Sequence, residues 1–392
     1  MTWGLLCSAA PSAALLSIAI WIYLLLFRDG FWRADQRLGE AGPRGSWPAV
    51  CAVIPARNEA DGIGRTVASL LGQDYPGALT LVVVDDNSND GTADVAGAAA
   101  AGDTRLHVVG GAPLAPGWTG KLWAVSQGID AAGVRAPDAE FLLLTDADIE
   151  HDPGNLRRLV FKAETEVRDL VSLMVMLRAE DFWERWLIPA FVFFFQKLYP
   201  FPAVNDRKAK LAAAAGGCML VRRRALEAAG GIDAIKDALI DDCALARLIK
   251  GEGAGRSIWL GLATRTKSLR AYRELAEIWD MVARSAYVQL DHSPIQLFGT
   301  VIGMGVIYLV PPAALITGAW AGDAALTAMG GAAWLSMIRA YAPTLALYRL
   351  PAWRGLLLPL VAGLYTLMTL SSAWRHWRGR GGAWKGRHYG SG

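Results

Sequence analysis

The chain has 392 residues, of which 53% are hydrophobic and only 19% are charged, and its formal net charge is +3. Its mean hydropathy of +0.27 excludes a disordered chain and most simple cytosolic enzymes, because both are more polar. Basic residues are dispersed outside the C-terminal tail, so we expect no nucleic-acid partner.

Residues 1–28 are predicted to form a transmembrane anchor. No Asp, Glu, Lys or Arg occurs before Arg28, and residues 5–27 are long enough to cross a hydrocarbon core of about 30 Å as a helix. A secretory signal peptide is the alternative, but it would carry an early positive charge and a shorter apolar run. A basic, Trp-containing flank follows Arg28, which favours a retained anchor.

Residues 293–374 are predicted to hold two or three transmembrane segments, taken from the apolar runs 295–320, 324–348 and 355–373, before a basic tail at 375–392. Arg339 is expected to face another helix or the membrane interface. Basic residues after the first span and in the tail favour the cytoplasmic side for both, and three full crossings cannot satisfy this. The Pro311-Pro312 pair makes the first of the three runs the one expected to be broken or re-entrant.

Residues 48–292 alternate short apolar runs with helical patterns. Strands are expected at 49–54, 79–84, 105–109 and 141–144, and each is followed by an expected helix, near 62–71, after 91, from 121 and from 153. This rhythm predicts an α/β domain with a mostly parallel, buried sheet. The four cysteines, Cys7, Cys51, Cys218 and Cys243, lie far apart and are expected to be reduced core thiols rather than a metal site or disulfide framework.

Polar residues follow three of the predicted strands, where ligands of such sheets bind. They are Arg57, Asn58, Glu59, Asp85, Asp86, Asp146 and Asp148. Any one carboxylate could simply cap the next helix. Five on one rim repel one another unless a cation or ligand neutralises them, so the set predicts a binding site.

Asp146 and Asp148 directly follow the buried run FLLL. Two carboxylates so spaced can reach one hard cation, and Mg²⁺ typically takes one or two carboxylates plus phosphate oxygens. A DxD pattern is weak alone, but it is strengthened here by the earlier pair in VVVDDNS. An EF-hand loop at 85–91 is rejected because the required Gly and Glu are missing.

The segment GWTGK, residues 117–121, is not a Walker A motif, because Ala115 replaces the upstream glycine and Leu122 follows Lys121. Gly120 opens a predicted helix, and a helix N-terminus beside Lys121 suits a diphosphate. The alternative is a surface turn with a solvated lysine.

The segments PARNE, VVVDDNS, GWTGK, TDAD, GGCMLVRRRALEAAGGID and IDDCALA resemble the family 2 type of nucleotide-sugar glycosyltransferase over roughly residues 48–290. The membrane layout is most similar to that of hopene-associated glycosyltransferases and, more distantly, ceramide glucosyltransferases. The resemblance implies a GT-A fold, which is a Rossmann-like, mixed, mostly parallel sheet with flanking helices, here joined to N- and C-terminal transmembrane helices.

The resemblance also implies roles for individual residues. Asp146 and Asp148 are expected to bind Mg²⁺ or Mn²⁺ and, through it, the donor diphosphate. Asp242 is expected to be the general base, with Asp241 in place of the first acid of the family's Glu-Asp pair. The nucleotide-sugar-binding residues are expected to be Pro55, Arg57, Glu59, Asp85, Asp86, Lys121, Asp146 and Arg284.

Inverting sugar transfer suits these residue types, because a carboxylate must take the acceptor proton and a divalent ion stabilises the leaving nucleoside diphosphate. The five histidines are scattered, so hydrolase triads have no support. The expected reaction moves one sugar from a nucleotide donor, with UDP favoured, onto a lipid such as a hopanoid or related isoprenoid. The expected location is the inner membrane, with several crossings and the catalytic domain in the cytoplasm.

Residues 183–202 are predicted to form a helix in the membrane interface, because their apolar core is too short to span and is rich in aromatics; a buried core helix is the alternative. Arg207, Lys208 and Lys210 follow it and could meet anionic head groups. The tail motif GAWKGRHY, residues 382–389, also resembles related membrane glycosyltransferases.

Two other functions stay open. A processive polysaccharide synthase would keep the family's Gln/Arg-x-x-Arg-Trp element, whereas residues 281–285 read MVARS and retain only Arg284. A non-catalytic, nucleotide-binding membrane scaffold would tolerate loss of Asp146, Asp148 and Asp242, which are all present.

Overall fold

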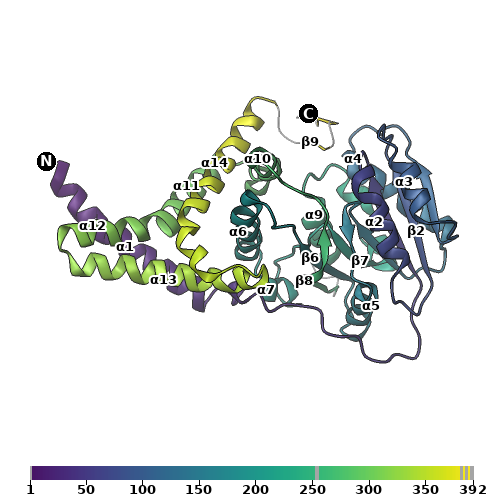
Figure 1. Ribbon diagram of the computed structural model, residues 1–392, viewed down its shortest axis with the longest axis horizontal. Coiled ribbons are helices and arrows are strands. Elements are labelled where there is room, and N and C mark those ends of the chain that lie inside the picture. The colour runs from purple at the N-terminus through teal and green to yellow at the C-terminus, as the bar shows by residue number, and fades with distance from the viewer. Residues whose placement is uncertain (1, 252–255, 380–382, 385–386, 389–392) are drawn as a thin grey trace.

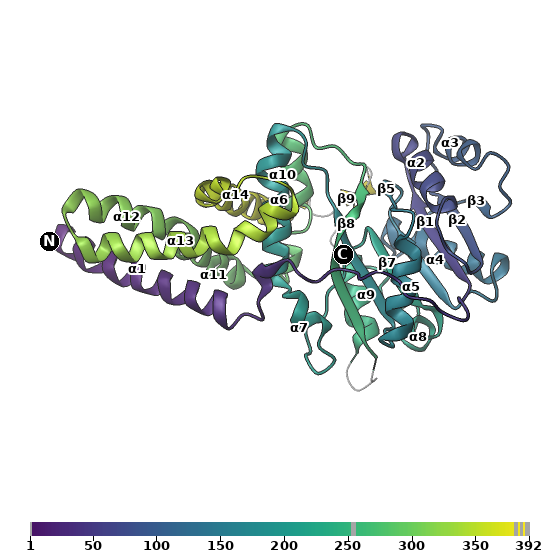
Figure 2. The same cartoon turned by 60° about the horizontal axis from the view of Figure 1, so that its bottom comes forward.

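The structure is a computed structural model that describes residues 2–251, 256–379, 383–384 and 387–388. An α/β domain lies at one end, and a helical arm that carries the N-terminus projects from the other (Figure 1). A layer of helices joins the two parts (Figure 2).

The domain is built on one eight-stranded sheet of order β3-β2-β1-β4-β7-β6-β8-β5. β1 pairs in parallel with β2 and β4, whereas β7 runs antiparallel to its neighbours β4 and β6. The predicted mostly parallel sheet is therefore confirmed, with β7 and β5 as the antiparallel members. The strands are β1 Val50–Ala56, β2 Leu79–Asp85, β3 Leu106–Gly110, β4 Phe141–Thr145, β5 Ile149–Glu150, β6 Leu170–Met176, β7 Cys218–Arg222 and β8 Ile258–Ser268.

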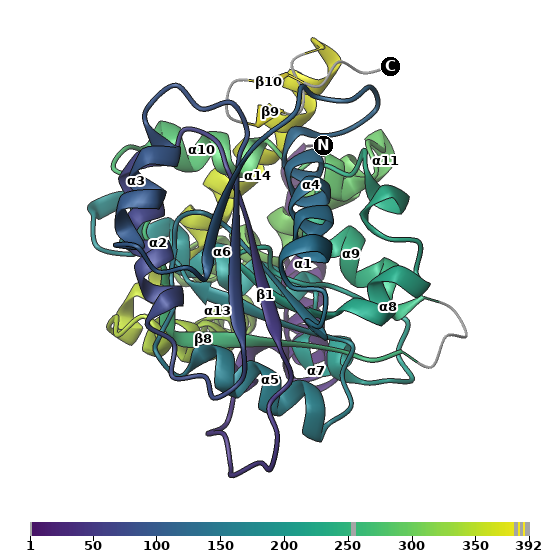
Figure 3. The same ribbon diagram turned by 90° about the vertical axis from the view of Figure 1, so that its right-hand side faces the viewer.

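Helices cover both faces of this sheet, with α2 and α3 on one side of β1 and α4 on the other (Figure 3). All residues of β1 and β4 are buried, which is why both read as unbroken apolar runs. Each fully buried Val or Leu stabilises the domain by about 1.5–3 kcal/mol. The helices of the domain are α2 Ala60–Leu71, α3 Thr92–Ala99, α4 Gly120–Arg135, α5 Asn155–Thr165, α8 Arg223–Ala228, η2 Ile232–Ile235, α9 Asp241–Lys250 and α10 Leu275–Ala283.

In the arm, α1, α12 and α13 run side by side along the long axis, whereas α14 runs across it at the base (Figures 1 and 2). Two helical runs, Pro294–Ala321 and Ala352–Trp377, are long and apolar enough to cross a membrane, and Ala10–Leu26, the part of α1 whose side chains are described, is a shorter apolar stretch. The remaining elements are α1 Thr2–Leu26, η1 Phe31–Arg33, η3 Val288–Leu290, α11 Pro294–Met304, η4 Gly305–Leu309, α12 Val310–Ala321, α13 Ala324–Leu347, η5 Ala352–Leu357, α14 Leu358–Trp377, β9 Ala383–Trp384 and β10 Arg387–His388.

The expected break at Pro311-Pro312 is wrong. Residues 294–321 form one helical run, with a π-helical turn, η4, directly before the prolines. Both prolines lie in the first turn of α12, where the π-turn has already displaced the regular hydrogen bonds, so their missing N–H groups cost little. Arg339 stacks its guanidinium over Trp32 at 4.6 Å, so it faces a neighbouring element as expected.

The predicted interfacial segment 183–202 forms two helices, α6 (Phe182–Leu198) and α7 (Phe201–Asn205). α6 stands between the α/β domain and the arm (Figure 2). Leu187, Ile188 and Phe193 at its centre are fully buried, while only its two ends expose large apolar side chains. The alternative of a buried core helix therefore describes the centre of α6, because residues of the arm pack over the side chains that were predicted to contact lipid.

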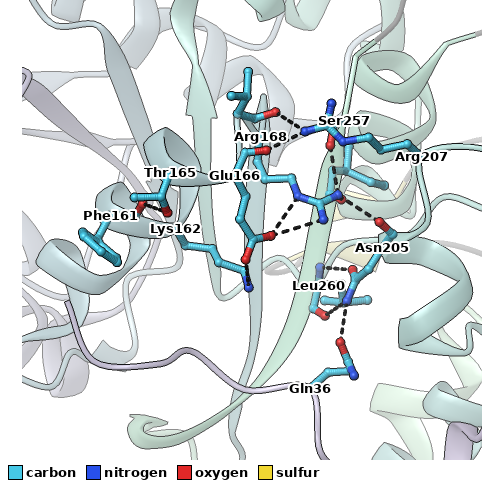
Figure 4. Close-up of polar contacts among 12 residues, drawn as sticks. Gln36, Phe161, Lys162, Thr165, Glu166, Arg168, Asn205, Arg207, Ser257 and Leu260 are labelled. Carbon is cyan, nitrogen blue, oxygen red and sulfur yellow. Dashed lines mark hydrogen bonds and ion pairs between the residues drawn. The ribbon is translucent and has the colours of Figure 1, made fainter. Parts of the chain in front are cut away.

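The segment that follows α1 is connected to the α/β domain by hydrogen bonds. The carbonyl of Gln36 accepts a hydrogen bond from the backbone N–H of Leu262 at 2.7 Å. The Asn205 side chain donates to Gln36 Oε1 at 3.1 Å and to the carbonyl of Leu260 at 3.0 Å (Figure 4). Arg168 adds bonds to the Asn205 carbonyl and Ser257 Oγ, both at 2.9 Å. These bonds couple the arm to β8 and α7.

Three of the four cysteines, Cys51, Cys218 and Cys243, are free and buried, as expected. Burial raises the pKa of Cys51 and Cys218 to about 12, so their thiols stay protonated and unreactive. The side chains of Cys7 and of the tail motif at 382–389 lie outside the described part of the chain.

Candidate functional site

The loops after β1 and β2 are cross-linked at the carboxyl edge of the sheet. The backbone N–H of Asn58 donates to Ser88 Oγ, and that of Glu59 donates to Thr92 Oγ1, both at 2.9 Å. Asn58 has a φ of 51°, in the left-handed region that asparagine tolerates better than most residues. These contacts hold the predicted binding residues of both loops at one end of the sheet.

Arg57 and Asp86 interact with each other at this edge of the sheet. The side chain of Asp86 is fully buried, and Arg57 Nη1 lies 3.8 Å from its Oδ2 and donates to its carbonyl at 2.5 Å. Asp85 Oδ1 accepts from the backbone N–H of Ser88 at 3.3 Å. Acidic and basic side chains held by these bonds therefore lie together at the end of β2.

Lys121 is the centre of a second cluster. Its Nζ lies 2.8 Å from Asp146 Oδ1 and 3.0 Å from Asp241 Oδ2. Burial lowers the pKa of Lys121, but the two carboxylates outweigh it and the net shift is upward. The alternative of a solvated lysine in a surface turn is therefore wrong, because Lys121 joins the end of β4 to the start of α9.

Asp242 lies beside this cluster. Its Oδ2 accepts from the Gly216 N–H at 2.9 Å, and its Oδ1 accepts from the Cys243 N–H at 2.7 Å. Burial and the charge of Asp241 raise the pKa of Asp242 to about 6, against the opposing effect of Lys121. A Cβ at position 216 would lie 3.3 Å from Lys121 Nζ, so glycine permits the close approach. A carboxylate with this pKa is ionised at neutral pH and basic enough to accept a proton.

The activity is expected to fall as the pH is lowered through about 6. A raised pKa means that Asp242 becomes protonated at a higher pH than an ordinary carboxyl, and the protonated form cannot act as a base. The pKa of Asp146 is lowered, so it stays ionised over this range. The measurement is kcat/KM from about pH 5 to about pH 8, with a decline approaching tenfold per pH unit on the acidic side. A flat acidic limb would contradict the assignment.

Arg270, on the segment after β8, was missed by the sequence reasoning. Its Nε lies 2.9 Å from Asp148 Oδ2, and its Nη2 lies 3.0 Å from Glu59 Oε1. Burial lowers its pKa, but Asp148 and Glu59 raise it more, so it stays charged. The cluster of carboxylates indicated that a positive charge had to neutralise them. No sequence motif around Arg270 identified this residue as the source of that charge.

His151 was also missed, and it lies beneath the DxD turn. Thr145 Oγ1 donates its only hydrogen to the Gly217 carbonyl at 2.7 Å, so His151 Nε2 must be the donor in its 3.0 Å contact with that hydroxyl. Nδ1 then accepts from Asn155 Nδ2 at 3.1 Å. Burial lowers the pKa of His151 to about 3, so it is neutral. This chain of bonds ties β4 to the glycine pair that holds Asp242.

The donor set suits a divalent ion that arrives with a diphosphate. Among the described residues, no three His, Cys, Asp or Glu side chains gather as a metal-binding group. Mg²⁺ and Mn²⁺ need only one or two carboxylates when phosphate oxygens complete the shell, and Asp146 and Asp148 are hard oxygen donors. Burial alone would raise the pKa of Asp146, but Lys121, Arg284 and Arg270 lower it, so it is ionised. Arg270 forms an ion pair with Asp148, so a metal ion that binds Asp148 would have to displace Arg270 or share the carboxylate with it.

The predicted site residues therefore fall into three neighbouring groups. Pro55, Lys121, Asp146, Gly216 and Asp241 line one cleft, with Asp242 beside it. Glu59 and Asp148 are joined through Arg270, and Arg57 is joined to Asp86. Arg284 is exposed after α10, and its charge reaches Asp146.

Known proteins match this chain in sequence and in fold. Residues 51–230 match the family model described as glycosyl transferase family 2. The chain is 22% identical over 293 residues to a beta-monoglucosyldiacylglycerol synthase of Trichormus variabilis, covering 69% of this chain and 58% of that protein. It is 33% identical over 124 residues to an undecaprenyl-phosphate mannosyltransferase of Micrococcus luteus, covering 30% and 44%. The chain spans 17% to 58% of the length of the curated relatives it matches.

Among solved structures, a mannosyltransferase from Pyrobaculum calidifontis in complex with GDP-Man and Mn²⁺ has the same fold. The TM-score is 0.56 at 19% sequence identity, covering 94% of this chain and 99% of that chain. Residues 51–230 thus resemble glycosyl transferase family 2 in sequence, and the chain shares the α/β GT-A fold of that mannosyltransferase.

Proposed function

We propose that this protein is a membrane-bound, metal-dependent, inverting glycosyltransferase that moves one sugar from a UDP-sugar onto a lipid. The observation that carries the proposal is the cleft in which Lys121 bridges Asp146 and Asp241 next to Asp242. Asp242, the proposed base, follows Asp241 in the chain, and Lys121 connects Asp241 to Asp146, which is one of the two carboxylates proposed to bind the metal.

The residues of this cleft divide the chemistry between them. Asp242 accepts the proton of the acceptor hydroxyl as its oxygen attacks the anomeric carbon from the face opposite the diphosphate. Lys121 holds Asp241 and Asp146 in place and adds positive charge beside the leaving group. Asp146 and Asp148 would hold Mg²⁺ or Mn²⁺, which supplies electrostatic stabilisation of the leaving diphosphate when bound.

The nucleoside is assigned to the cross-linked loops. Glu59, Asp85 and Asp86 lie at the ends of β1 and β2, where acidic groups can accept hydrogen bonds from ribose or base. Arg57 contacts Asp86, and we assign the exposed Arg284, whose charge reaches Asp146, to the diphosphate. Pro55 forms part of the cleft wall.

A lipid acceptor is supported by the neighbourhood of the domain. The helical arm and α6 lie on one side of it, and two relatives are named after lipids, a beta-monoglucosyldiacylglycerol synthase and an undecaprenyl-phosphate mannosyltransferase. We assign residues 1–28 and 293–374 to the membrane, 48–292 to a catalytic domain on the cytoplasmic side of the inner membrane, and 375–392 to a basic tail. A hopanoid or related isoprenoid lipid is the acceptor that we propose.

The direct test incubates purified protein in detergent with Mn²⁺, membrane lipid extract and a panel of UDP-glucose, UDP-galactose, UDP-N-acetylglucosamine and GDP-mannose. Mass spectrometry should show one added hexose or N-acetylhexosamine on a lipid. A polymeric product would instead support the processive synthase. Absence of transfer and of donor hydrolysis over the whole panel, with nucleotide binding retained, would support the scaffold.

A further inference from the structure

The last apolar helix differs from the rest of the arm in direction. α14 runs across the long axis that α1, α12 and α13 share, at the junction with the α/β domain (Figures 1 and 2). Together with the preceding turn, η5, it forms an apolar run of 26 residues, which is long enough to cross a membrane. The amino-acid composition of α14 therefore does not determine whether it crosses a membrane, so its contacts with the rest of the protein have to answer this question.

Both ends of this run are bonded to the layer of helices that joins the α/β domain to the arm. At its start, Arg354 Nη1 donates to the carbonyl of Arg185 in the first turn of α6 at 2.9 Å. At its end, Arg375 Nη2 lies 2.7 Å from Asp280 Oδ1 on α10. α6 connects β6 to β7 and α10 follows β8, and both lie in the layer of helices between the sheet and the arm (Figure 2). A spanning helix would instead place its ends on opposite sides of about 30 Å of hydrocarbon.

The two faces of α14 differ in burial. One face packs on α6, where the Tyr365 hydroxyl donates to the Leu187 carbonyl at 2.8 Å, and a larger share of this run is buried than of the run 294–321. The opposite face exposes Leu360, Leu367 and Trp374, at 67%, 52% and 53%. These three positions are seven residues apart and so project in nearly the same direction.

We infer that α14 lies in the plane of the inner leaflet, with its exposed apolar face against lipid, and that it does not cross the bilayer. Arginines flank the helix, two before it and two at its end, and suit the anionic head groups at that surface; they are Arg349, Arg354, Arg375 and Arg378. The basic residues after α1, before α14 and after α14 then all lie on one side. This placement rests on the membrane attachment in the proposed function, and it removes the charge conflict that three full crossings create.

Depth measurements test the inference. Spin labels are attached to Leu360→Cys, Leu367→Cys and Trp374→Cys in a Cys7→Ala background, because the other native thiols are buried. The protein is reconstituted in vesicles of phosphatidylethanolamine and phosphatidylglycerol at about three to one, and collision with oxygen and a water-soluble nickel complex gives each depth. We expect one shallow depth for all three labels. A spanning helix would spread them over about 21 Å, from 14 residues at about 1.5 Å each. That gradient, or three fully aqueous labels, would overturn the inference.

A sidedness measurement gives an independent check. Arg378→Cys, just after α14, and Val134→Cys, exposed on the α/β domain, are labelled with a membrane-impermeant maleimide in spheroplasts and in inverted vesicles. Both should react only in inverted vesicles, and reaction from opposite sides would overturn the inference. Neither measurement uses sugar transfer, so a protein without transferase activity would still report the path of α14.

Discussion

Replacing Asp242 with asparagine should reduce transfer by about 10²–10⁴-fold, the usual contribution of a positioned general base, while UDP binding changes little. The amide cannot accept the acceptor proton, although it keeps the size of the carboxylate. Transfer is followed by lipid product formation and UDP affinity by calorimetry in the presence of Mn²⁺. Loss of UDP binding in this variant would contradict the role given to Asp242.

Asp241→Asn is the matched control. Asp241 pairs with Lys121 at 3.0 Å, so its loss loosens the cluster but leaves the base in place. We expect a smaller loss of kcat than in Asp242→Asn. Asp242 also accepts two backbone N–H bonds, and an amide can satisfy only one of them. Thermal unfolding of both variants therefore has to accompany the kinetics, since an unmet donor costs about 1–3 kcal/mol.

The second large effect is expected at the pair Asp148 and Arg270. Asp148→Asn removes one of the two carboxylates that suit the metal, so Mn²⁺-dependent UDP binding should weaken at least tenfold and transfer should be lost. Arg270→Gln should instead strengthen the binding of Mn²⁺ in the absence of UDP, because it removes the guanidinium that forms ion pairs with Asp148 and Glu59. Calorimetric titration with Mn²⁺, first without and then with UDP, separates the two.

The two variants make the interpretation falsifiable. If Arg270→Gln weakened Mn²⁺ binding as strongly as Asp148→Asn, the guanidinium would be a support of the site and not a competitor for its carboxylate. Arg270→Lys is the control, because it keeps the charge but can no longer bridge both carboxylates through a planar fork. It should fall between the wild-type protein and Arg270→Gln in Mn²⁺ affinity.

The first four strands and the helices between them were predictable because each signal is local. Buried parallel strands read as apolar runs, and Gly91 and Gly120 mark the starts of helices at the expected places. The DxD turn was found for the same reason, since it directly follows β4. Strands β6, β7 and β8 were not singled out, because α6 and α7 interrupt the βαβ rhythm between β6 and β7.

The residues that neutralise and orient the site could not be found in this way. Arg270 is 122 residues from Asp148 and 211 residues from Glu59. His151 is only six residues from Thr145 and four from Asn155, but the spacing of these residues matches no known motif. Such pairs leave no periodic or spaced pattern in a single chain. These contacts are determined by burial and by charges on residues that the fold brings together.

The amino-acid sequence by itself determined the class of the domain, the edge of the sheet that carries chemistry and the carboxylates placed there, because strand ends and helix starts are written in adjacent residues. The tertiary structure alone decided which cations meet those carboxylates, that the centre of α6 is covered, and that α14 turns across the arm. An apolar helix has the same composition whether it crosses a bilayer or lies along it. Only the partners at its two ends, here Arg185 and Asp280, distinguish the two paths.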